Sequence, residues 1–134
     1  MLFIDMKLRN ILIESKIYRN VTHGTTKQSA DSIMKSGFKL PDRGALFFDA
    51  KGQKGSLHQV YGSDATITCD LQSTNPISMA DVRSKIFPEM KSKNIIHNEK
   101  NTHKYLRTKG YDLIDNTNEL IVLDPKIIKI KKEK

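Results

Sequence analysis

Three short segments, far apart along the chain, hold the residue types best suited to chemistry. In the first, His23 and Thr25 flank Gly24, so an imidazole and a hydroxyl stand beside a backbone without a side chain. Residues 44–48 supply two aromatic rings, and Glu119 opens a late apolar run with an isolated carboxylate. An imidazole, open backbone, a flat ring and an acid are together suited to a nucleotide pocket, provided that folding brings the three segments to one place.

The segments before the histidine predict elements that would deliver it. Apolar residues recur at helical spacing over residues 3–15, which predicts an amphipathic N-terminal helix within residues 1–16. Residues 17–22 alternate apolar and polar side chains and include β-branched ones, so they predict a strand that ends at His23. The histidine would then lie at a strand end, where the chain is free to turn.

A short helix is expected after the histidine. Thr25 and Gln28 form a capping-box pattern, and Gly37 is placed to end the helix in a left-handed turn. The buried stripe of this helix is expected at three positions: Ala30, Ile33 and Met34. Unpaired N–H groups at such a helix start favour anionic or amide groups of a ligand.

The remaining elements mix helix and strand without regular alternation. Strands are predicted at residues 45–48, 65–71 and 127–130, a helix at 98–109, a hairpin at 113–123, and a less regular helix at 81–93 that Pro88 bends or ends. This order favours an α+β fold with mostly antiparallel sheet. The glycine-rich fingerprints of Rossmann and P-loop nucleotide sites are missing from the sequence.

Composition predicts one domain of an ordinary globular protein over residues 1–134, with 37% hydrophobic and 28% charged residues. The single cysteine, Cys69, favours a reducing compartment. No apolar run predicts a membrane span or a leader. We therefore expect a cytoplasmic monomer without membrane contact. A formal net charge of +8 suits phosphate-rich or acidic partners. The basic tail at 131–134 is either a solvated end or a nucleic-acid contact.

The ordered set of motifs resembles ADP-ribosyltransferases of the His-Tyr-Glu type, the diphtheria-toxin and poly(ADP-ribose) polymerase group, and above all its small phage and bacterial members. The resemblance spans roughly residues 18–130 and includes four further pieces: Ser36-Gly37-Phe38, Asn75-Pro76-Ile77, residues 109–114 and residues 119–125. It implies split antiparallel β-sheets with flanking short helices and NAD as co-substrate. In this group such compact enzymes are often effectors or toxins, a role that rests on analogy.

The resemblance assigns NAD-binding roles to the first segment. His23 would hydrogen-bond the adenosine-side ribose, and the backbone of Gly24 would pair with the nicotinamide carboxamide. Thr25 would add a hydroxyl near the ribose. A pocket ring is expected from residues 44–48, where either Phe47 or Phe48 fits the pattern, because alternation puts them on opposite faces. Phe48 is the preferred choice.

The resemblance assigns a second stacking ring to Tyr61 and the chemistry to Glu119. Cleavage of the nicotinamide–ribose bond builds positive charge on the ribose, which a carboxylate at the 2′-hydroxyl stabilises. Thr117 stands where arginine-directed members carry Glu or Gln, so an arginine acceptor is not expected. His97 and His103 are predicted to be surface residues, and no metal site is predicted.

The leading hypothesis is therefore a mono-ADP-ribosyltransferase with a protein or nucleic-acid acceptor. Two alternatives stay open. One is an NAD glycohydrolase, in which water takes the place of the acceptor, and the other is a basic nucleic-acid-binding module without turnover.

Overall fold

The computed structural model describes residues 16–50 and 65–131. The predicted helix at residues 3–15 therefore lies outside the described residues, as do Tyr61 and nearly all of the basic tail, while Lys16 begins β1. The described elements, in chain order, are β1 (Lys16–Thr25), α2 (Lys27–Ser36), β2 (Leu46–Asp49), β3 (Ala65–Ser73), β4 (Pro76–Ser78), α4 (Met79–Asp81), the π-helical turn η1 (Val82–Ile86), α5 (Phe87–Ser92), α6 (Glu99–Thr108), β5 (Leu113–Asn116), β6 (Glu119–Val122), the 3-10 turn η2 (Pro125–Ile127) and β7 (Ile128–Ile130). Among the described residues, no helix has the length and apolar character to cross a membrane.

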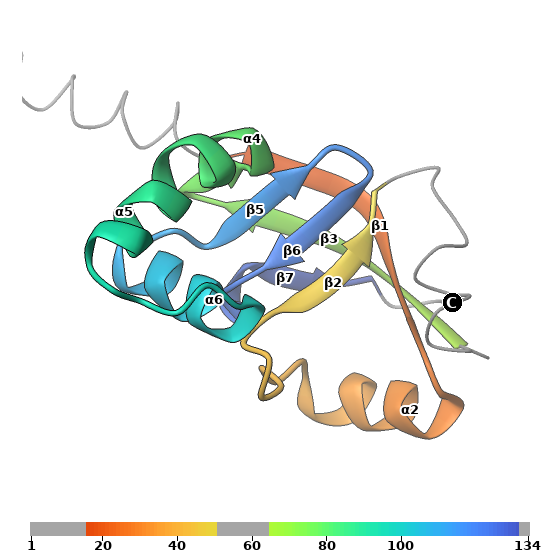
Figure 1. The fold of residues 1–134 in the computed structure, drawn as a ribbon. Helices are drawn as coiled ribbons and strands as arrows, with labels where there is room; N and C mark the ends of the chain where they lie inside the picture. Colours follow the sequence, from red (N-terminus) through yellow and green to blue (C-terminus); the bar gives the residue numbers. More distant parts are fainter. Residues whose placement is uncertain (1–15, 51–64, 132–134) are drawn as a thin grey trace, which may run out of the picture.

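The strands form one seven-stranded mixed sheet in the order β4-β5-β6-β2-β1-β3-β7 (Figure 1). This confirms the α+β class. The expected division into separate antiparallel sheets is not what the strand pairing shows, since β4 runs parallel to β5 and all seven strands are linked. The parallel pair arises because the helical segment between β4 and β5 provides the crossover that parallel strands require.

One junction in this sheet is much weaker than the others. Strand β1 pairs with β3 over nearly its whole length, but with β2 only through Thr22 and Asp49. Strand β2 pairs with β6 at all four of its positions, so β4-β5-β6-β2 and β1-β3-β7 are two well-joined groups that meet at one residue pair.

Two apolar cores lie on opposite faces of the β4-β5-β6-β2 group. The first core joins this group to β1 and β3, with Phe48 and Leu120 from one side and Val21, Cys69 and Leu71 from the other. The second core lies beneath the helices α4, η1, α5 and α6, which Figure 1 shows gathered over β5 and β6. Alternation along β2 and β6 sends successive side chains into different cores, so both faces of these strands are buried.

Helix α2 begins one residue later than the capping-box pattern predicts. Its N-cap is Thr26, whose hydroxyl accepts a hydrogen bond from the Ser29 N–H at 3.1 Å, while Thr25 still belongs to β1. The helix buries no residue completely, and Met34 is 46% exposed rather than part of a buried stripe. Gly37 ends the helix with φ 83°, as predicted. The helix is therefore attached at its ends and along one narrow side.

The late elements agree closely with the predicted ones. The hairpin of β5 and β6 turns at Thr117, which has φ 59°, and α6 follows its N-cap Asn98, the first residue of the predicted helix. Pro88 does not break the helical region but stands in the first turn of α5, directly after the π-helical turn in which the Phe87 N–H bonds to the Val82 carbonyl. The uncertain region 81–93 is thus helical throughout, with a π-helical turn before the proline.

Candidate functional site

His23 is held in one orientation near the end of β1. Its Nδ1 lies 2.8 Å from the carbonyl oxygen of Phe47, so this nitrogen carries the proton and donates. The ring also packs against the rings of Phe38 and Phe48, each with its centroid 5.2 Å away. The hydrogen bond crosses from β1 to β2 beside their weak junction.

A cavity of about 400 Å³ opens beside this histidine, and we call it the His23 cavity. One wall is formed by His23, Gly24, Thr25 and Thr26, and the other by residues between Pro41 and Phe47. All three residues predicted from the first segment therefore reach one hollow.

Of the two candidate rings, Phe47 is the one that lines the His23 cavity. Phe48 is 0% exposed and lies in the first core against Val21 and Leu71, so it has no surface for a ligand. The preference for Phe48 is therefore corrected in favour of Phe47. Alternation predicts that the two rings oppose each other, but which face becomes core depends on the strands and helices that pack there. The predicted partner ring, Tyr61, lies outside the described residues.

A second cavity, of about 420 Å³, continues from the first on the other side of Phe47 and Arg43, and we call it the Glu99 cavity. Both of these residues line both hollows. The Glu99 cavity lies over β5 and β6, where Ile114 and Ile121 form its floor. The two cavities are thus neighbouring parts of one concave surface.

Arg43 is the main positive charge between the two cavities. Its Nη2 lies 2.8 Å from Glu99 Oε1, and its guanidinium carbon lies 4.4 Å from the centre of the Phe47 ring. Both contacts orient the guanidinium along the cavity wall. Because the Arg43 and Glu99 side chains are 41% and 46% exposed, the ion pair itself contributes little to stability.

The loop that carries Arg43 is fastened to α6 by two side chains. His103 Nδ1 donates to the Arg43 carbonyl at 2.8 Å, and Arg107 donates to the carbonyl of Gly44. Gly44 has φ 80°, and a Cβ there would meet Arg107 Nη1 at 3.0 Å, so a glycine is needed for this close approach.

His103 is not the surface residue that the sequence predicts. It is 4% exposed, and its ring lies 6.2 Å from the ring of Phe47. Burial lowers the pKa of this imidazole, in opposition to its hydrogen bond with the Arg43 carbonyl. A neutral His103 therefore supports the loop from below.

Glu119 begins β6, next to β2. Its register partners are Asp49 on β2 and Asn116 on β5, and alternation places it on the same face as Ile121 and Phe47. Burial and then the nearby charge of Asp49 raise the pKa of the Glu119 carboxyl, against the opposing effects of Asn116 and Arg43. A carboxyl with a raised pKa beside another acid is typical of functional sites.

Glu119 and His23 therefore lie on the two strands that flank β2. Strand spacing separates these outer strands by roughly 10 Å. The pairing of Thr22 with Asp49, however, puts Thr22, not His23, on the face that carries Glu119, and the His23 ring packs against Phe48 on the other face. Glu119 is not among the described lining residues of either cavity, and its link to them is electrostatic, through Arg43 and Glu99. The structure thus joins His23, Gly24, Thr25 and Phe47 in one hollow and leaves Glu119 at its border.

Four site residues were missed from the sequence: Arg43, Asp49, Glu99 and His103. Only Arg43 had a usable signal, because a cation in a Pro-Asp-Arg-Gly turn directly before an apolar strand is well placed to line a pocket. The other three reach the site through pairing and packing of distant segments.

The arrangement offers stacking, hydrogen-bonding and charge on one surface. A flat ring can stack on Phe47, polar groups can pair with the β1 end, and Arg43 can meet an anion. In comparisons with known proteins, the chain matches no protein-family model and no curated protein sequence.

Proposed function

We propose that this protein is a mono-ADP-ribosyltransferase that cleaves the nicotinamide–ribose bond of NAD and transfers ADP-ribose to a macromolecular acceptor. The proposal rests on the resemblance of its motifs to the His-Tyr-Glu group. The observation that supports it most is the His23 cavity, in which His23, Gly24, Thr25 and Phe47 meet, with Glu119 on the strand next to β2.

The His23 cavity would hold the nicotinamide and its ribose. Gly24 would pair with the carboxamide through its backbone, and the nicotinamide would lie against Phe47. His23 would hydrogen-bond the adenosine-side ribose and Thr25 the ribose region. Arg43, on the wall of the same cavity, supplies positive charge suited to the pyrophosphate.

The chemistry would use Glu119 as a carboxylate. As the C1′–N bond breaks, its electron pair leaves with nicotinamide and the ribose becomes oxocarbenium-like. The carboxylate stabilises this charge at the 2′-hydroxyl, and the acceptor then attacks C1′. The partly buried environment of Glu119, which raises its pKa, also strengthens its attraction for a cation.

NAD labelled in the adenylate part tests the proposal. The wild-type protein should release nicotinamide and pass label to a macromolecule from a cell extract. Glu119→Gln should reduce release on the order of 100-fold or more, because a preorganised charge is lost. Asp31→Asn, on the exposed side of α2, removes the same charge elsewhere and should leave the rate unchanged.

The outcomes separate the candidate functions. Release of nicotinamide without transfer of label would assign an NAD glycohydrolase. A wild-type protein that leaves NAD intact, or a Glu119→Gln variant as fast as the wild type, would refute the proposal.

A further inference from the structure

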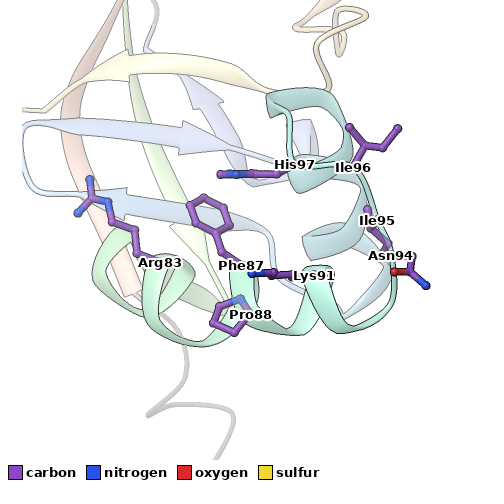
Figure 2. A pocket seen from close by; sticks show the side chains of 8 residues that line it. All are labelled: Arg83, Phe87, Pro88, Lys91, Asn94, Ile95, Ile96 and His97. Carbon is purple, nitrogen blue, oxygen red and sulfur yellow. The ribbon is translucent and has the colours of Figure 1, made fainter.

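A third and larger cavity, of about 760 Å³, opens on the helical side of the molecule, and we call it the Phe87 cavity. Figure 2 shows that the Phe87 ring and the His97 imidazole lie side by side in its lining. Their ring centres are 4.0 Å apart at an interplanar angle of 52°. His97 is exposed, so one side of this ring pair faces solvent.

The end of α5 explains how the two rings meet. Asn94 has φ 59°, the left-handed conformation that ends a helix, and the N–H of Ile95 bonds back to the Met90 carbonyl at 2.9 Å. The chain therefore reverses and brings His97 back over α5. Ile96, 74% exposed, is left at the rim.

The charges around the Phe87 cavity are all positive. Arg83 and Lys91 line it, and neither forms an ion pair or side-chain hydrogen bond with another residue in 16–50 or 65–131. The acids of the same helical segment are directed elsewhere: Asp81 pairs with Lys85 at 3.9 Å, and Glu89 with Lys109 at 2.7 Å. The cavity thus combines an apolar ring pair with two available cations.

The Phe87 cavity is linked to the proposed catalytic surface by shared lining residues. It shares Phe87 and His97 with the Glu99 cavity, which in turn shares Arg43 and Phe47 with the His23 cavity. A chain-like ligand can therefore be followed from Arg83, across the ring pair, to the site where C1′ of NAD would react.

We propose that the Phe87 cavity binds single-stranded nucleic acid and presents it as the acceptor, an assignment of acceptor class that rests on the proposed function. Single strands bind where aromatic faces stack with bases and cations follow the phosphates, the combination found here. An acidic peptide would satisfy Arg83 and Lys91 but has no flat group for the ring pair. A duplex keeps its bases stacked inside and leaves the rings without a partner.

The transfer step balances with these components alone. A nitrogen or hydroxyl of the bound strand attacks C1′ of NAD and forms the new bond. The C1′–N bond breaks, nicotinamide leaves with its electron pair, and the proton of the attacking group passes to water.

Binding is measured first, without NAD, by fluorescence anisotropy with labelled DNA and RNA single strands of roughly 12 nucleotides. The double variant Arg83→Glu/Lys91→Glu should weaken binding at least about 10-fold and reduce the salt slope by roughly 1.4, as expected for two lost phosphate contacts. His97→Ala should weaken binding about 5-fold or more, through lost stacking. The control Lys104→Glu/Lys129→Glu reverses two exposed lysines that line none of the three cavities and should keep wild-type affinity.

The inference is overturned if the wild type does not bind, if the control loses as much affinity as the test variant, or if the duplex or a poly-glutamate peptide binds as tightly as the single strand. The NAD assay then separates the two proposals. Salt-sensitive binding of the strand without nicotinamide release would refute the transferase proposal and support the nucleic-acid site. If Arg83→Glu/Lys91→Glu releases nicotinamide and labels the strand as the wild type does, the nucleic-acid site is refuted and the transferase proposal is supported.

Discussion

The β5–β6 hairpin has a carboxylate at each end, and the two carboxylates have very different surroundings. Asp112, just before β5, is 6% exposed and accepts hydrogen bonds from Ser73 Oγ, from both the N–H and the hydroxyl of Thr74, and from the Asn75 N–H. Glu119, at the turn end, has Asn116 as a hydrogen-bond partner and the like charge of Asp49 nearby.

The difference separates a structural acid from a candidate catalytic one. The hydrogen bonds that the Asp112 carboxylate accepts from residues 73–75 lie where β3 ends and the turn to β4 begins, so its charge stabilises this part of the fold. The surroundings of Glu119 instead disfavour its ionised form when no ligand is bound. A positive charge at the site would stabilise that form.

Replacing each acid by its own amide gives the sharpest comparison. Asp112→Asn should destabilise the protein by about 2 kcal/mol or more, because the amide NH₂ would face N–H groups that now donate to the carboxylate, and these partly buried donors would lose their charged acceptor. Glu119→Gln should change the free energy of unfolding by less than about 0.5 kcal/mol, or increase it. Urea unfolding of both variants measures this, and equal losses would contradict the distinction.

The pH dependence of NAD cleavage tests the Asp49 contribution. Because the ionised form of Glu119 would act, kcat/KM should fall as the pH decreases through the raised pKa of this carboxyl. Asp49→Asn removes the neighbouring negative charge and should move this acid limb to lower pH. A limb that does not move would show that Asp49 has no influence on Glu119.

The smallest effect is expected at His103, beneath the same surface. Its pKa is lowered by burial, so the unfolded chain binds the proton more readily, and stability should fall as the pH drops below 6.5. His103→Gln can keep a donor to the Arg43 carbonyl but cannot titrate. Its melting temperature should therefore change less than that of the wild type between neutral and acidic pH, and parallel changes would argue against this role.

Local sequence signals were sufficient for the elements that depend on neighbours in the chain. The β5–β6 hairpin follows from a polar turn between apolar runs, and α6 follows from its cap Asn98 and the closing Gly110. The cap of α2 shifted from Thr25 to Thr26 because β1 continues through Thr25, which pairs with Ala65.

The parts of the site that depend on tertiary packing could not be read in this way. Two adjacent phenylalanines on a strand point to opposite faces of the sheet, but the sequence does not show which face is covered. The packing of β1 and β3 covers Phe48 and leaves Phe47 to line the cavity. The sequence around His103 is that of a helical surface histidine, and only the packing of the Arg43 loop against α6 buries it. The ring pair of Phe87 and His97 depends on the chain reversal at Asn94.

The single residue pair between β1 and β2 has a consequence for how the site can be altered. With so few backbone hydrogen bonds across this junction, the separation of the two strands is governed mainly by the rings wedged beside it, where Phe38 and Phe48 lie 5.4 Å apart and both touch His23. The separation of the two strands is therefore a matter of side-chain volume. A smaller or larger ring at the partly buried Phe38 would change this separation, whereas the same change at Phe48 would also disturb the first core.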